Sequence, residues 1–146
     1  MDESTYRSGR EDINRLPCVF ERALLAHCAA CELSRRHAQA ERESIACSSP
    51  VARAACNQLA GLLREKSAFA LGLARTARVL PHAMVMKIQC GGLKGLQAVL
   101  DPAAPAPDVH RLVRMAVERH GDLAALPFSQ MVQSVAAWQG RRRKSP

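Results

Sequence analysis

The sequence predicts an all-α protein, organised as a single-domain orthogonal bundle of five or six helices. Its 146 residues correspond to one domain, and 48% of them are hydrophobic while only 3% are aromatic. A core dominated by Ala, Leu and Val favours closely packed helices over a β-sandwich. Apolar residues also recur at helical spacing along most of the chain, and we find no alternating strand pattern of useful length.

The first expected helix follows a polar N-terminal segment. We expect residues 1–16 to form a flexible lead, because they hold no periodic apolar pattern. Pro17 suits the first turn of a helix, where its missing N–H costs nothing. An amphipathic stripe then follows at Val19, Phe20, Ala23, Leu24 and His27. Whether this helix continues through residues 28–44 stays open, because neither Gly nor Pro interrupts that stretch.

The second expected helix has a clear start. Ser49 and Pro50 provide an N-cap and a proline at the first helical position. A wide apolar face then runs to about Arg78. Pro81 either ends this segment or opens the next helix, which we expect to run through residues 84–100.

Three glycines lie inside that next helix: Gly91, Gly92 and Gly95. Each costs about 0.5–1 kcal/mol relative to Ala in a helix interior, so each needs a reason. Either a neighbouring helix approaches closely here, or a cofactor approaches the backbone just after Cys90. The glycines lack the spacing and the preceding strand of a dinucleotide-binding loop. We expect close packing to be the reason.

The C-terminal part of the chain contains two further helices. Residues 101–107 form a proline-rich connector, and Asp108 can cap a helix that runs to His120 and stops at Gly121. Ser129 is then expected to cap a last helix. The expected organisation is a helical domain at residues 17–140, which carries the cysteine site, and a basic tail at residues 141–146.

The charge of the chain is strongly positive. The net charge is +8 and the isoelectric point is near 9.8, so nucleic acid is a possible partner. Four of the cations lie together in the tail, from Arg141 to Lys144, whereas the arginines of the body alternate with glutamates. Any contact with nucleic acid is therefore expected to use the tail. No apolar run reaches the length of a membrane span, so we expect a cytoplasmic protein without a membrane contact.

The six cysteines are the most informative residues in the chain. In a reducing compartment, cysteines at this density hold a metal or perform redox chemistry more often than they form disulfides. Cys18 lies ten residues from its nearest companion, so we assign it to packing. Cys28 and Cys31 have the short spacing that metals use for two ligands.

We expect a metal site formed by Cys28, Cys31, Cys47 and Cys56. Cys47 precedes the capped helix start, where the positive end of the helix dipole favours a thiolate, and Cys56 lies two turns into that helix. Arginines surround the set in sequence and can offset its negative charge: Arg35, Arg36, Arg42 and Arg53.

The length of the segment between Cys31 and Cys47 leaves an alternative open. A straight helix there would separate these two residues by on the order of 20 Å, so the first ligand set requires the chain to fold back. An unbroken helical hairpin would instead bring Cys90 beside Cys28 and Cys31. That rival set would be completed by His27, Cys18 or an exogenous ligand.

The spacing favours an iron–sulfur cluster, of the [4Fe–4S] type, over zinc. Structural zinc sites use two short-spaced ligand pairs, and only one such pair is present, whereas clusters accept wider spacing and all-cysteine ligation. The expected function is electron transfer, redox sensing or support of a redox enzyme, which would be the protein partner. We identify no catalytic residues. The alternative is a cofactor-free helical interaction module that binds protein or RNA, with packing cysteines.

Overall fold

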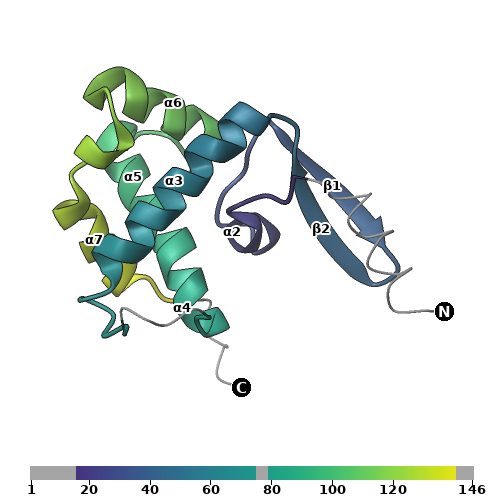
Figure 1. The fold of residues 1–146 in the computed structure, drawn as a ribbon, viewed down its shortest axis with the longest axis horizontal. Helices are drawn as coiled ribbons and strands as arrows, with labels where there is room; N and C mark the ends of the chain where they lie inside the picture. The colour runs from purple at the N-terminus through teal and green to yellow at the C-terminus, as the bar shows by residue number, and fades with distance from the viewer. Residues whose placement is uncertain (1–15, 75–78, 141–146) are drawn as a thin grey trace.

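The protein consists of a helical bundle and a β-hairpin that projects from it (Figure 1). The computed structural model describes residues 16–74 and 79–140. Both termini of the chain, including the lead at residues 1–15 and the tail at residues 141–146, lie outside the described residues. The elements in chain order are α2 (Glu21–Leu25), β1 (Ser34–Gln39), β2 (Arg42–Cys47), α3 (Pro50–Ser67), α4 (His82–Met86), the π-helical turn η1 (Lys87–Gly91), α5 (Gly92–Leu100), α6 (Val109–His120), the 3-10 turn η2 (Leu123–Ala125) and α7 (Phe128–Ala137).

The prediction of an all-α fold is wrong. Residues 34–47 form a two-stranded antiparallel sheet, in which Ser34 pairs with Cys47 and Gln39 pairs with Arg42. The turn between the strands contains Ala40, whose φ of 57° lies in the left-handed region. The fold is therefore mixed, with one β-hairpin attached to a set of helices.

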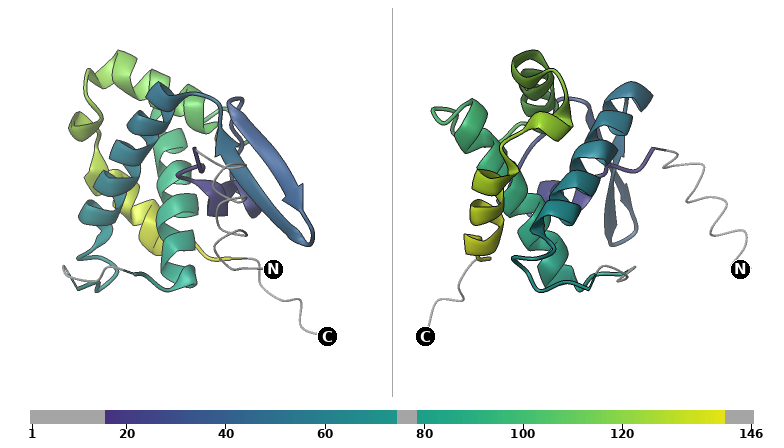
Figure 2. Two further views of the ribbon diagram at one scale, coloured as in Figure 1. Left: turned by 45° about the vertical axis from the view of Figure 1, so that its right-hand side comes forward. Right: turned by 60° about the vertical axis from the view of Figure 1, so that its left-hand side comes forward.

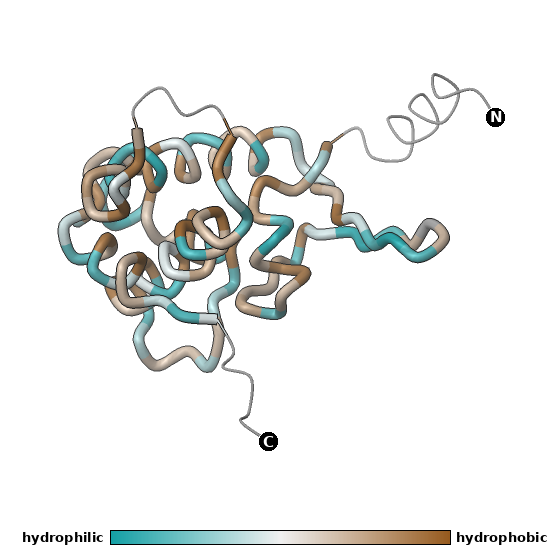
Figure 3. The backbone as a smooth tube through the Cα atoms, turned by 90° about the horizontal axis from the view of Figure 1, so that it is seen from below, coloured by the Kyte–Doolittle hydropathy of each residue, from teal (hydrophilic) through white to brown (hydrophobic). Residues whose placement is uncertain are grey.

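The hairpin replaces a helix because its residues have almost no apolar face to bury. The segment is largely polar and charged, and the hairpin extends as a mostly hydrophilic arm (Figure 3). Among the strand residues whose exposure the structure describes, only Ile45 and Ala46 are buried. The outer edge of β2 also gains backbone partners, since the Cys18 N–H donates to the Ile45 carbonyl at 2.8 Å and the Cys47 N–H to the Leu16 carbonyl at 2.7 Å. These tertiary contacts override the helix propensity of the segment.

The first expected helix is present but short. It begins at Glu21, four residues after Pro17, and ends at Leu25. His27 has a φ of 59°, so the chain leaves the helix there and does not continue as a helix towards residue 44. Residues 28–44 therefore form a loop and then the strands of the hairpin, and they do not continue the first helix.

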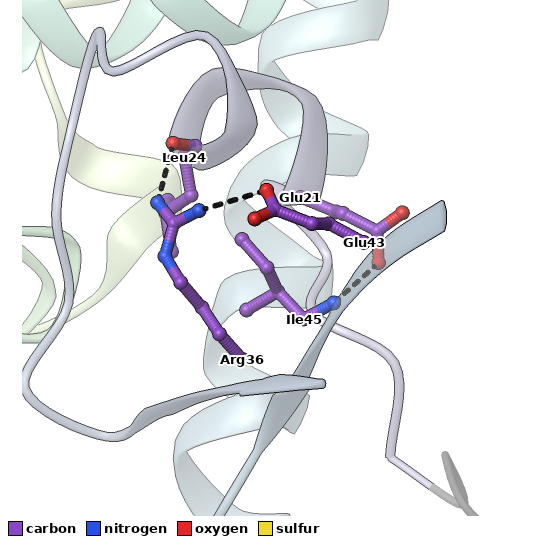
Figure 4. A network of polar contacts seen from close by, with 5 residues as sticks. All are labelled: Glu21, Leu24, Arg36, Glu43 and Ile45. Atoms are coloured by element: carbon purple, nitrogen blue, oxygen red, sulfur yellow. Dashed lines mark hydrogen bonds and ion pairs between the residues drawn. The ribbon is translucent and has the colours of Figure 1, made fainter. Parts of the chain in front are cut away.

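A small polar network fastens the hairpin to α2 (Figure 4). The Glu21 carboxylate accepts a hydrogen bond from the Ile45 N–H at 3.0 Å. From β1, the Arg36 guanidinium donates to the Leu24 carbonyl at 3.0 Å and forms an exposed ion pair with Glu43 at 3.4 Å. Because these contacts bridge the strands and the helix, they fix the position of the hairpin on the body.

The predicted start of α3 is confirmed, and its predicted end is wrong. The Ser49 hydroxyl accepts the Ala52 N–H at 3.2 Å, and Pro50 is the first helical residue. The helix ends at Ser67, well before Arg78, which itself lies outside the described residues. Pro81 directly precedes α4 and therefore opens the next helical segment.

The glycines of the next segment serve close packing, as predicted. α4, η1 and α5 follow one another without a break from residue 82 to residue 100. A Cβ atom on Gly91 would lie 2.7 Å from the Cα of Val135, and one on Gly95 would lie 3.0 Å from the Cα of Met131. The absence of side chains at these glycines therefore lets α7 pack directly on this segment, beside α3 (Figure 2).

The C-terminal helices match their predicted boundaries except at one end. The Asp108 carboxylate caps α6 by accepting the Arg111 N–H at 3.1 Å, and Gly121 ends that helix with a φ of 78°. α7 begins at Phe128 after Pro127, so Ser129 lies inside the helix and does not cap it. None of the helices in the described ranges has both the length and the hydrophobicity that a membrane crossing requires.

Candidate metal centre

Four cysteine side chains line one pocket between the hairpin and the helices. They come from four separate places in the chain: Cys18 before α2, Cys31 before β1, Cys47 at the end of β2 and Cys56 in α3. All four are free thiols and partly buried. Three of them belong to the set expected from spacing. The fourth is Cys18, whereas the spacing predicted Cys28.

The hairpin is the reason that Cys31 and Cys47 meet. Since Ser34 pairs with Cys47, the chain returns after the turn to a point close to where it left the Cys31 loop. The same strand end brings in Cys18, because residues 16–18 run alongside β2 and the Cys18 N–H bonds to Ile45. A helix over residues 32–45 could not have produced this convergence.

The first turns of α3 form a second wall of the pocket. Ala52, Arg53 and Cys56 line it from one side of the helix. The Arg53 Nε donates to the Pro17 carbonyl at 2.8 Å, which holds the guanidinium at the pocket. Among the four arginines expected near the cysteines, Arg53 lines the pocket, whereas Arg36 binds α2 and the hairpin.

The start of α6 closes the pocket on a third side. Ala30 pairs with Asp108 in a parallel bridge, through hydrogen bonds of 2.9 Å from the Ala30 N–H to Pro107 and from the Val109 N–H to Ala30. This pairing places Val109 and His110 in the pocket wall. No spacing signal in the sequence pointed to His110, because its approach depends on a contact between residues far apart in the chain.

Backbone N–H groups point at two of the sulfurs. The Cys18 sulfur accepts a hydrogen bond from the Phe20 N–H, and the Cys31 sulfur accepts from the N–H groups of Leu33 and His110. Such donors stabilise the thiolate form of cysteine. They also resemble the hydrogen bonds to sulfur that tune the reduction potential of iron–sulfur proteins.

Burial nevertheless keeps three of the four thiols protonated when no cation is present. Desolvation raises the pKa of Cys18 to about 11 and that of Cys56 to about 12, and it also raises the pKa of Cys31. Negative charge on Cys47 raises the pKa of each of these three further, and charge on Cys31 does the same for Cys18 and Cys56. Four thiolates could therefore coexist here only with a positive charge among them.

The sulfurs stand wider apart than the ligands of a single ion. The cavity that they line has a volume of about 20 Å³, which accommodates about one water molecule. Consistent with this, no three His, Cys, Asp or Glu side chains in the described part of the chain are grouped tightly enough to hold one metal ion.

The remaining two cysteines form a separate pair. Cys28 does not line the pocket, and its thiol is hydrogen-bonded to that of Cys90, which is 2% exposed. The rival ligand set is therefore not brought together: Cys31 lines the pocket, whereas Cys28 and Cys90 form the separate pair. His27 lies outside the pocket wall as well.

Comparison with protein-family models, with curated proteins and with solved structures finds no match to this chain.

Proposed function

We propose that this protein carries a metal centre bound by Cys18, Cys31, Cys47 and Cys56, and that the centre is an iron–sulfur cluster. The observation that carries the proposal is the convergence of four thiols from four segments on one pocket. A chain that used these cysteines only for packing would have no need to bring all four together, since each could fill space separately.

The residues of the pocket suit such a group. Four cysteines are the usual ligands of a cluster, and the N–H donors at Cys18 and Cys31 would stabilise bound thiolates. Arg53 and the first turns of α3 add positive potential. Most of the remaining wall is aliphatic, including Val19, Leu33 and Val109, which would limit the access of water.

The spacing of the cysteines along the chain favours a cluster over one zinc ion, and either group would require the pocket to rearrange. A zinc ion would require the four segments to draw together, whereas a cluster, which places several metal atoms among the cysteines, would require the walls of this one-water cavity to move apart. The separation of the four cysteines along the sequence agrees with this choice, because it lacks the two short-spaced pairs of a structural zinc site.

The proposed role is one-electron redox chemistry with a protein partner, either electron transfer or redox sensing. A cluster in this pocket would supply a reversible one-electron couple. The four thiols are only partly buried, so the site lies close to the surface that a partner could approach. Six free thiols suit a reducing compartment, and we therefore propose the cytoplasm as its location.

The test is the metal content of the protein purified without oxygen. We expect visible absorbance from a cluster, with iron and acid-labile sulfide in comparable amounts. Cys18→Ser should lose both, while Cys28→Ser should keep both. The two variants are matched, because both replace a partly buried thiol by a hydroxyl that ligates iron poorly.

Two results would contradict the proposal. Stoichiometric zinc in place of iron would retain the site and remove the redox role. A colourless, metal-free and stable protein, recovered even after cluster assembly with iron and sulfide is attempted, would instead favour a helical interaction module.

A further inference from the structure

A second cysteine site lies where the loop after α2 meets η1. Cys90 is the fourth residue of the π-helical turn and belongs to the hydrophobic core, while Cys28 packs against that core and remains partly exposed. The two thiols share a hydrogen bond, so their sulfurs are direct neighbours. Neither side chain lines the four-cysteine pocket.

Backbone contacts hold Cys28 towards its partner. His27 adopts a φ of 59°, a conformation that is unfavourable for a residue with a side chain, and the Cys28 N–H then bonds to the Ala23 carbonyl at 2.9 Å. This left-handed residue turns the chain back at the end of α2.

The π-helical turn holds Cys90 from the other side. Gln89, its neighbour, accepts the Ala23 N–H at 3.0 Å and donates to the Val19 carbonyl at 3.2 Å. Since Ala23 therefore contacts both cysteine-bearing segments, the two segments are tied at one point. Single π-turns within α-helices often mark functional positions, which agrees with a specific role for this one.

We propose that Cys28 and Cys90 form a reversible intramolecular disulfide when the protein meets a low-molecular-weight disulfide such as oxidised glutathione. The closed form would join the loop after α2 to η1 by a covalent bond. Closure brings the two sulfurs, which already share a hydrogen bond, to the ~2.05 Å of a disulfide.

The exchange proceeds in two balanced steps. The more exposed Cys28, as its thiolate, attacks one sulfur of oxidised glutathione, forms a mixed disulfide and releases one glutathione thiolate. The Cys90 thiolate then attacks the Cys28 sulfur and releases the second glutathione. Two electrons pass from the protein to glutathione, and the protons of the two protein thiols pass to solvent or to the released thiolates.

The second step should be the slower one. Burial raises the pKa of Cys90, and the neighbouring Cys28 raises it further. Little thiolate is therefore present at neutral pH, and closure should accelerate as the pH rises.

The experiment exposes the purified full-length protein to defined ratios of oxidised to reduced glutathione and measures its intact mass and its disulfide-linked peptides. We expect the parent to lose the mass of two hydrogen atoms, with residues 28 and 90 in one cross-linked peptide. Cys90→Ser should stop at a glutathione adduct on Cys28, and Cys28→Ser should gain no adduct at Cys90.

Three outcomes would overturn the proposal. They are a stable glutathione adduct on Cys28 of the parent without closure, a cross-link through other cysteines in place of this one, and a parent that keeps both thiols reduced at every ratio. The proposal is independent of the metal centre, because the variant Cys18→Ser should still form the Cys28–Cys90 bond.

Discussion

At the scale of single residues, the thiols of Cys18, Cys31 and Cys56 bind their protons more tightly in the folded protein than in the unfolded chain. Their reference pKa is 9.0, and burial raises it to about 11 for Cys18 and about 12 for Cys56. A group whose pKa is raised by folding contributes stability that is present below its unfolded pKa and is lost as the pH rises towards its folded pKa. The metal-free protein should therefore lose stability above about pH 9.

This pH dependence is testable by thermal unfolding of the metal-free protein between about pH 8 and about pH 10.5. We expect the midpoint to fall across this range. The fall should be smaller for Cys56→Ser, because serine does not titrate there. A midpoint that is equally pH-dependent in the parent and in this variant would show that the Cys56 thiol is not desolvated.

The same protons should be released when a metal binds. At neutral pH the thiols of Cys18, Cys31 and Cys56 are protonated, and a metal takes cysteine as the thiolate, so loading displaces protons. Using Zn²⁺ as a convenient probe, we expect the release of at least about three protons, from Cys18, Cys31 and Cys56, measured by calorimetry in buffers of different ionisation enthalpy. Cys28→Ser should release the same number. A release of about two would indicate that only two of the pocket thiols bind.

At the scale of elements, the hairpin depends on one carboxylate at its base. Glu21 accepts the Ile45 N–H in a partly buried setting, whereas Glu43 forms only an exposed ion pair with Arg36. Hydrogen bonds to charged groups contribute about 1.5–3 kcal/mol, and exposed ion pairs contribute about 0–1 kcal/mol. Glu21→Ala should therefore destabilise the protein clearly more than Glu43→Ala.

Denaturant unfolding of the two variants measures this difference. Hydrogen exchange should also locate it, with faster exchange at the Ile45 amide in Glu21→Ala. Equal stability of the two variants would mean that the hairpin is held on the body by other contacts.

The helices provide a matched pair of glycine substitutions. Gly91→Ala would place a Cβ 2.7 Å from the Cα of Val135, where only backbone movement can relieve the overlap. We expect a loss of about 1–3 kcal/mol. Gly61 lies inside α3, and a methyl group added there would have nothing within 4 Å, so Gly61→Ala should stabilise by about 0.5–1 kcal/mol. Chemical denaturation of both variants tests the opposite signs.

Local signals in the sequence were sufficient for most helix boundaries. Ser49 and Pro50 start α3, Asp108 caps α6 and Gly121 ends it, because each of these residues acts on the backbone beside it. The hairpin carried no such signal. Its turn at Ala40 has neither Asn nor Gly, and its strands consist of residues that tolerate a helix.

The same holds for the pocket: the spacing of residues along the sequence predicts some of its members, and contacts between distant segments determine the others. Spacing selected Cys31, Cys47 and Cys56, which lie near one another in sequence. Cys18 enters the pocket only because its segment pairs with the edge of β2, and Cys28 leaves the expected set because the chain turns at His27. Neither event is encoded in the distance between cysteines.

At the scale of the whole molecule, the site and the main core occupy different parts of the protein. The pocket lies between the hairpin, the start of α3 and the start of α6, whereas α5 packs on α7 through its glycines. Removal of the proposed metal should therefore affect these two parts unequally. Hydrogen exchange after chelation should increase within residues 16–47 and remain unchanged in α5 and α7. A uniform increase would contradict this separation.

The pairing of Ala30 with Asp108 has a consequence for the order of events during synthesis. A ribosome delivers all four pocket cysteines long before it delivers the start of α6, which carries the wall residues Val109 and His110 and an N–H donor to Cys31. A nascent chain that already displays every ligand therefore still lacks one side of the pocket. Insertion of the proposed cofactor should accordingly follow the release of at least the first 110 residues, and the thiols would have to stay reduced and unoccupied in the interval.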